Sequence, residues 1–160
     1  MPQDSTPDNA QDNVQGNAQK NTQNKETAIA IAQEWLTKSA QTATNKQFEE
    51  HFNLISKKVR VTGVHGYESI SYTDWARQSE QEFRDNVIKG VSYEGLKMLA
   101  TNETQIMFKT IETVFASDGT RKAQGVEILL TQEEDGVWRA TQERVLTNGE
   151  AIHDGLMKSL

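Results

Sequence analysis

Residues 105–145 read QIMFKTIETVFASDGTRKAQGVEILLTQEEDGVWRATQERV, and this stretch decides the fold. Apolar and polar side chains alternate along it, which indicates strands whose successive side chains point to opposite faces of a sheet. Asp118-Gly119 and Asp135-Gly136 interrupt the alternation, and Asp-Gly pairs are typical of tight hairpin turns. The stretch therefore predicts three antiparallel strands, over 104–117, 121–133 and 137–146.

The first of these strands is partly apolar on both faces. One face carries Ile106, Phe108, Thr110, Glu112 and Val114, and the other carries Met107, Lys109, Ile111, Thr113 and Phe115. We expect one face to pack on helices. Because monomers rarely leave large apolar patches bare, we expect the outer face of the sheet to form a homodimer.

The chain before this stretch has mainly helical periodicity. Apolar residues from Glu26 to Ala43 recur at helical spacing, and a second helix is predicted from Asn45 to Ser56. A short strand follows at 57–64, then a glycine-containing loop, and then a third helix capped by Thr73. With a further strand over 88–101, helices precede a strand-rich half, which indicates an α+β domain.

The N-terminal segment has a different composition. Residues 8–23 read DNAQDNVQGNAQKNTQ, one four-residue pattern written four times, and they offer very little apolar surface. Burying so little surface does not offset the entropy cost of ordering the backbone. The sequence therefore predicts a disordered Asn/Gln-rich spacer over 1–24, a folded domain over 25–147 and a C-terminal segment over 148–160.

Composition excludes several classes of site. The 160 residues include 17 basic and 23 acidic side chains, with no dense cluster of Lys and Arg, so we expect no nucleic-acid partner. No apolar run is long enough for a membrane span. The absence of cysteine excludes disulfide, thiolate and Cys-zinc chemistry. The three histidines lack metal-ligand spacing and no phosphate loop or dinucleotide fingerprint occurs, so we expect no metal and no cofactor.

The start of the sequence permits two interpretations of localisation. Met1 is followed at once by polar residues, with no basic start and no apolar run of a signal peptide. The chain is then either cytoplasmic or the mature, extracytoplasmic (periplasmic) form of a protein whose export signal has been removed. A long polar spacer at the N-terminus favours the second interpretation, since it would separate an anchored domain from its membrane.

The order of elements resembles the nuclear transport factor 2-like superfamily, and within it the SnoaL-like and ketosteroid isomerase-like domains. The resemblance covers about 26–147. It is carried by the Trp-containing first helix, the loop GVHGYESISYTDW and the terminal hairpin EEDGVWRATQERV. It implies a cystatin-like curved antiparallel sheet wrapped around three N-terminal helices, forming a conical cavity. That cavity serves isomerases, cyclases, dehydratases, plain binders and non-catalytic assembly modules.

The family's catalytic residues do not carry over to this sequence. Ketosteroid isomerase-like enzymes use an aspartate base, a tyrosine and a protonated aspartic acid. Here the strand KKVRVTGV offers no carboxylate, and the first helix has no tyrosine. The Asp and His pair of SnoaL-like cyclases has no match either. The sequence therefore assigns no catalytic residue by resemblance.

Glu112 is the candidate acid/base residue. If Ile106, Phe108 and Val114 face the helices, so does Glu112, and a buried carboxyl has a raised pKa suited to proton transfer. The alternative is an ordinary solvated glutamate at the open end of the sheet, paired with Lys122 or Arg144.

Aromatic and imidazole side chains supply further candidates for ligand binding. His51 lies beside Phe52 and is expected at the mouth of the cavity, unless it is an ordinary buried histidine with a backbone partner. The loop Gly63–Tyr72 contributes His65 and Tyr67, and Tyr72 and Trp75 follow closely behind them as further candidates. The alternative for Tyr67 and Trp75 is that they only close the core beneath the loop.

Two hypotheses for function follow. The first is a domain that binds a small apolar or carbonyl-bearing molecule between sheet and helices and acts as a lyase or isomerase. The second is a non-catalytic, dimerising interaction module of the cell envelope, tethered by its N-terminal spacer. The sequence does not decide whether the chain is an enzyme.

Overall fold

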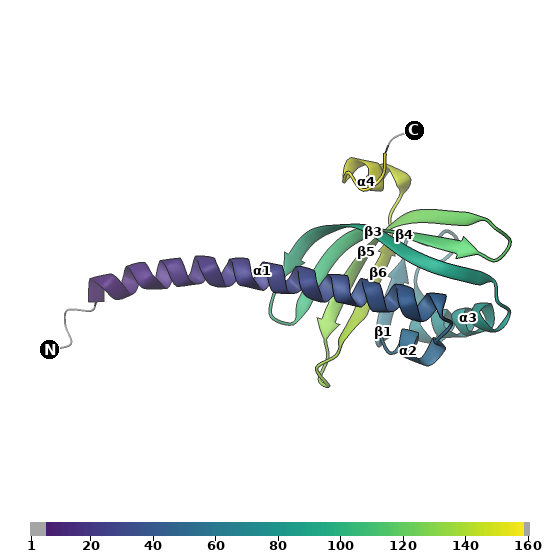
Figure 1. Cartoon of the computed structure of the whole chain (residues 1–160), viewed down its shortest axis with the longest axis horizontal. Helices are drawn as coiled ribbons and strands as arrows, with labels where there is room; N and C mark the ends of the chain where they lie inside the picture. Colours follow the sequence, from purple (N-terminus) through teal and green to yellow (C-terminus); the bar gives the residue numbers. More distant parts are fainter. Residues whose placement is uncertain (1–5, 159–160) are drawn as a thin grey trace.

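A six-stranded curved sheet wraps around three helices, and a fourth helix lies on the outer side (Figure 1). The computed structural model describes the backbone of residues 6–158 and the side chains of residues 24–158. The sheet has the order β2-β1-β6-β5-β4-β3. The predicted α+β class, with helices first and a meander after them, is confirmed.

Helix α1, Thr6–Thr44, is much longer than the helix predicted over 26–43. The sequence predicts no regular structure in residues 1–24, but residues 6–24 continue α1, and residues 1–5 lie outside the described part. Once packing has formed the later turns, each further residue adds a backbone hydrogen bond without a new nucleation cost. Pro7 falls in the first turn, where a missing N–H is tolerated. Figure 1 shows this N-terminal half extending beyond the sheet.

None of the described helices combines the length and the apolar character needed to cross a membrane.

The next two helices are short. Helix α2 spans only Phe48–Phe52, because the chain turns at Asn53 and enters a strand at Ile55. The predicted helix over 45–56 is therefore too long, although Phe52 and Ile55 are both buried as the pattern indicated. Helix α3 spans Tyr72–Arg84, and its cap is Ser71, whose hydroxyl accepts from the Asp74 N–H, rather than Thr73.

The sequence predicts five of the six strands, each to within two residues at its ends, and misses the two-residue strand Ile70–Ser71, which lies in a segment predicted as a loop. The six strands are β1 Ile55–Thr62, β2 Ile70–Ser71, β3 Ile88–Thr101, β4 Gln105–Ala116, β5 Arg121–Gln132 and β6 Trp138–Val145. The meander from β3 to β6 is antiparallel throughout. The exception in the sheet is β1, which pairs with β6 in parallel and with β2 in antiparallel fashion.

The core lies between α1 and the concave face of the sheet. Four residues of α1 pack against the inward side chains of the meander; the cluster is Ala28, Ala32, Trp35, Leu36, Ile106, Phe108, Val126, Ile128, Leu130 and Ala140. The Trp35 indole also donates to the Leu54 carbonyl at 3.0 Å, which ties α1 to the start of β1. A second apolar cluster joins Phe52, Ile55, Val59 and Val61 beneath α3.

The C-terminal segment covers part of the outer sheet face. Helix α4, Asn148–His153, packs its buried Ala151 close to Gly125 of β5, where the absence of a side chain permits the approach. Asp154 then forms ion pairs with Lys109 at 2.6 Å and with Lys97 at 3.2 Å. Ile111, on the outer face of β4, is only 6% exposed. The predicted need for a cover on this face is thus met in part by the chain itself.

A β-bulge in β6 changes which side chains face inward. Ala140 pairs with Leu130 and Gln142 pairs with Leu129, so Thr141 is one extra residue in the ladder. Strict alternation from the buried Ala140 would turn Gln142 inward and Glu143 outward. Because of the bulge, Gln142 is exposed and Glu143 is buried on the concave face beside Ile128.

Candidate functional site

A cavity of about 370 Å³ lies between the helices and the concave face of the sheet. Aromatic side chains from several elements line its walls: Trp35, Tyr67, Trp75, Phe83 and Tyr93. Three carboxyl groups also line it, those of Glu82, Glu112 and Glu143. The other polar groups belong to Ser39, His51, Gln78, Ser79 and Gln124. Aliphatic side chains of the sheet make up most of the remainder. The volume is at the small end of the range for ligand pockets, about 300–1,000 Å³.

Glu112 enters the cavity from β4, as the alternation in this strand predicts. The Tyr93 hydroxyl donates to Glu112 Oε2 at 3.2 Å, and Gln124 Nε2 approaches Oε1 at 3.4 Å. Tyr93 is in turn 3.1 Å from the buried Ser39 hydroxyl of α1. Lys122 and Arg144 do not take part: Lys122 is exposed, and Arg144 pairs with Glu127 and Glu150.

Glu143 enters the same cavity from β6 and has a different environment. The residue is only 7% exposed, and its side chain makes no hydrogen bond or ion pair within the part of the chain that the structure describes. Its carboxyl group borders the cavity. No fully buried side-chain oxygen among the described residues lacks a partner, so the Glu143 oxygens are open to the cavity. A carboxyl group in such an enclosed place is costly when it is charged, so it favours protonation or a ligand.

The two carboxyl groups affect one another's ionisation. Burial, and then the charge of Glu112, raises the pKa of Glu143 to about 8. Burial also raises the pKa of Glu112, while the hydrogen bonds from Tyr93 and Gln124 oppose this rise by stabilising its charged form. Burial and the negative charges of both glutamates raise the pKa of Tyr93 well above its ordinary value of 10.0. At neutral pH, Glu143 is therefore the protonated member of the pair, while the hydrogen bonds from Tyr93 and Gln124 favour the charged form of Glu112.

His51 lies on the cavity wall as a neutral imidazole. Burial lowers its pKa to about 4, against an opposing contribution from the Ser39 backbone. Its Nδ1 is 2.9 Å from the Thr42 hydroxyl, which itself lies 2.8 Å from the Lys38 carbonyl. The Thr42 hydroxyl also lies 3.2 Å from the Ser39 carbonyl, so it links the imidazole to the backbone of α1.

Helix α3 closes the cavity on the side of Gly63–Tyr72. It contributes Trp75, Gln78, Ser79, Glu82 and Phe83 to the wall, yet none of its residues is fully buried. Glu82 accepts from Gln78 Nε2 at 3.0 Å. Tyr67 of the preceding loop also reaches the wall, although it is 65% exposed. This side is therefore the more loosely packed one.

The structure brings four of the six predicted site residues together around the cavity: His51, Tyr67, Trp75 and Glu112. The other two lie elsewhere. His65 is exposed and does not line the cavity. Tyr72, at the first turn of α3, packs edge-to-face on Phe52 and lines a separate groove instead.

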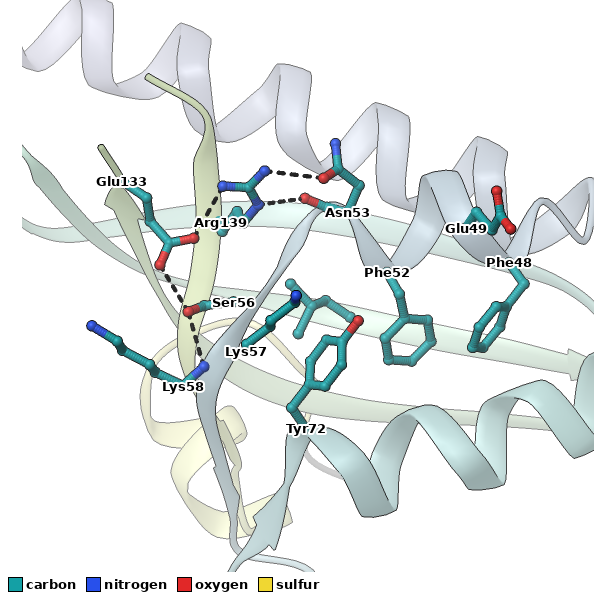
Figure 2. Close-up of a pocket in the computed structure, with 11 residues that line it drawn as sticks. Phe48, Glu49, Phe52, Asn53, Ser56, Lys57, Lys58, Tyr72, Glu133 and Arg139 are labelled. Atoms are coloured by element: carbon teal, nitrogen blue, oxygen red, sulfur yellow. Dashed lines mark hydrogen bonds and ion pairs between the residues drawn. The ribbon is translucent and has the colours of Figure 1, made fainter. Parts of the chain in front are cut away.

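Figure 2 shows that separate groove, which runs between α2 and β1 and is more open to solvent. Several of its polar groups are paired with one another. Arg139 donates to the Asn53 carbonyl at 2.8 Å and to Glu133 at 3.1 Å, and Ser56 donates to Glu133 at 2.9 Å. These bonds join the β5–β6 turn to β1 and leave an aromatic wall of Phe48, Phe52 and Tyr72. The other charged side chains of the groove, Glu49, Lys57 and Lys58, are exposed to solvent, whereas Glu143 in the cavity is buried.

Glu143, Tyr93, Ser39 and Gln124 are absent from the sequence prediction. Tyr93 and Gln124 could have been found by pairing β3 and β5 with β4, because both lie opposite Glu112 in the ladder. Glu143 could not, since the bulge at Thr141 reverses the alternation on which the prediction depends. No group of three or more potential metal ligands converges anywhere in the described residues.

Comparison with known proteins gives similar structures but no similar sequence. No protein-family model matches the sequence, and a search of curated proteins also finds no match. A candidate scytalone dehydratase from Novosphingobium aromaticivorans superposes with a TM-score of 0.65 at 10% identity, over 79% of this chain and 88% of that one.

Two further structures show the same architecture. An NTF2-like protein with a cystatin-like fold, also from N. aromaticivorans, has a TM-score of 0.62 at 14% identity, over 90% of this chain and 95% of its own. A candidate dehydratase of the NTF2-like family from Streptomyces avermitilis has a TM-score of 0.59 at 12% identity, over 76% of this chain and 96% of its own. At such identities the comparison shows the fold alone. The chain has the cystatin-like fold of the nuclear transport factor 2-like proteins, as the resemblance in its sequence predicted.

Proposed function

We propose that the cavity binds a small, mostly apolar, carbonyl-bearing molecule and that Glu112 and Glu143 move protons on it. One observation carries the proposal: two carboxyl groups enter one apolar cavity, and only one of them is held by hydrogen-bond donors. Different environments that give two neighbouring carboxyl groups different pKa values are typical of a catalytic acid and base pair. The dehydratase descriptions of two similar structures agree with this class of chemistry.

The roles follow from the protonation states. Glu112, whose charged form its hydrogen bonds favour, removes a proton from the carbon next to the carbonyl group, so that a C–H bond breaks and an enolate forms. Glu143, protonated at neutral pH, donates its proton either to a leaving hydroxyl group, which departs as water, or to a different carbon of the conjugated enolate. The first outcome is a dehydration and the second an isomerisation. After either one, exchange with solvent restores the starting protonation states.

The rate of hydrogen exchange tests the role of Glu112 without knowledge of the natural substrate. 2-Tetralone is a bicyclic ketone with exchangeable protons beside its carbonyl group, and ¹H NMR follows their replacement in D₂O. We expect the wild-type protein to accelerate this exchange about 10²-fold over buffer, the low end for a positioned base. Glu112→Gln should return the rate to that of buffer while 2-tetralone still binds.

A matched control is Glu94→Gln, because Glu94 lies on β3 but is exposed, outside the cavity. This variant should exchange 2-tetralone at the wild-type rate. If wild type and buffer gave equal rates, or if Glu112→Gln kept the full acceleration, the proposed proton transfer would be wrong.

A further inference from the structure

The charge balance of the cavity is one-sided. Its ionisable lining groups are Glu82 from α3, His51 from α2, Tyr67 from the loop, Tyr93 from β3, Glu112 from β4 and Glu143 from β6. Among the residues that the structure describes, the lining includes no lysine and no arginine. His51 supplies no compensating charge at neutral pH, because burial lowers its pKa to about 4. The wall therefore offers negative charge and nothing positive to balance it.

Glu143 is the second observation that points to a ligand. It is 7% exposed, it borders the cavity, and its carboxyl group lacks any hydrogen-bond or ion-pair partner among the described residues. An ionised carboxyl group in such a place needs a cation. The aromatic faces of Trp35, Trp75, Phe83 and the two tyrosines suit the apolar body of a ligand and also attract positive charge.

We propose that the cavity binds the protonated form of a small lipophilic amine, with its ammonium group near Glu112 and Glu143. The inference rests on one part of the proposed function, that the cavity admits a ligand, and not on the proton-transfer chemistry. An amine of this kind competes with a carbonyl ligand, since it requires Glu143 to be ionised while the carbonyl ligand uses Glu143 as a donor. Anionic ligands, such as carboxylates and phosphate esters, are rejected by the same charges.

The two ligand classes have opposite dependences on pH. Binding of an ammonium group displaces the proton of Glu143, so amine affinity rises with pH up to the pKa of Glu143, about 8, and then levels off. An aliphatic amine itself stays protonated through this range, because its pKa is about 10. A ketone that accepts a hydrogen bond from protonated Glu143 binds with constant affinity below pH 8 and more weakly above it.

Three probes that share the tetralin ring system and differ in one functional group separate these possibilities: 2-aminotetralin, 2-tetralone and tetralin-2-carboxylic acid. Their binding is measured by isothermal titration calorimetry at pH 8. We expect the amine to bind at least tenfold more tightly than the ketone and the acid not to bind. Glu143→Gln should lower amine affinity at least tenfold and change ketone affinity less than twofold. The exposed control Glu94→Gln should change neither. Amine affinity should also rise about tenfold between pH 6 and pH 7, with release of a proton.

Each other result has a definite meaning. If the ketone binds and the amine binds no more tightly, or if Glu143→Gln leaves amine affinity intact, the amine inference is overturned and the proposed function stands. If neither probe binds, both fail, because the cavity then admits no ligand of this size. Binding of the acid as tightly as the amine would overturn the charge argument itself.

Discussion

Glu143 makes the stability of the folded chain depend on pH through one residue. Its pKa rises from 4.5 to about 8 on folding, so the folded state binds more protons between these values than the unfolded state does. The stability that this proton uptake contributes to the folded state is complete below pH 4.5 and is lost as pH rises through 8. Because the cavity stays apolar, we expect the loss to be on the order of a few kcal/mol.

Glu143→Gln removes this dependence, since an amide does not ionise. Urea unfolding at pH 6 and pH 9 should show wild type losing a few kcal/mol of unfolding free energy between them, and the variant losing less than half as much. At pH 9 the variant should therefore be the more stable protein. Equal losses in the two proteins would mean that Glu143 titrates normally and is not held in an apolar site.

Tyr93 joins α1 to Glu112 through its hydroxyl group. Tyr93→Phe leaves Ser39 and Glu112 without this partner, and an unsatisfied buried polar group costs about 1–3 kcal/mol. We expect that loss in chemical denaturation at pH 7. Tyr67→Phe is the matched control, because Tyr67 is 65% exposed and should change stability by less than about 0.5 kcal/mol. Similar effects of the two substitutions would show that the Tyr93 hydroxyl contributes nothing particular.

At the scale of elements, α4 stabilises the sheet by covering its outer face. Ala151→Asp places a charge at a fully buried position against Gly125, and it should destabilise the protein by about 2 kcal/mol or more. Ile152→Asp, one residue further along, is the control, because Ile152 is 36% exposed. Differential scanning calorimetry of both variants checks this; equal melting temperatures would show that α4 does not pack as described.

The sequence predicts those elements whose local pattern agrees with their packing. The alternation and the Asp-Gly turns locate β4, β5 and β6, and alternation in β4 also places Glu112 on the concave face. It does not predict the short α2, because Ile55 continues a helical apolar face while the chain has already turned at Asn53. It misses Glu143 because the bulge at Thr141 depends on how β6 pairs with β5, which is information that no single strand carries.

At the scale of the whole molecule, the N-terminal half of α1 lies outside the domain. Figure 1 shows it extending past the sheet, and the first buried side chain of the described part of α1 is Ala28. Deletion of residues 1–24 should therefore leave the melting temperature nearly unchanged, since almost no apolar surface is lost. Circular dichroism should show fewer helical residues at the same midpoint. A fall of several degrees would show that this segment packs on the domain.

The homodimer stays a prediction. Part of the outer face is covered by α4, but Met107, Leu129 and Phe115 remain half-buried there. Multi-angle light scattering decides the matter: a dimer supports pairing through this remaining surface. A monomer would show that α4 covers enough of the outer sheet face to make dimerisation unnecessary. The division of the chain into spacer, domain and C-terminal segment, and the tethered envelope module, likewise remain proposals.

The central claim is that two glutamates share one apolar cavity and that Glu143 stays protonated at neutral pH. The most direct measurement is a ¹³C NMR titration of side-chain carboxyl groups in protein labelled at glutamate, with assignments from Glu112→Gln and Glu143→Gln. We predict one resonance that titrates near pH 8 and is missing in Glu143→Gln. If every glutamate resonance in the wild-type protein titrated below about pH 5.5, near the ordinary range for exposed carboxyl groups, the claim would be contradicted.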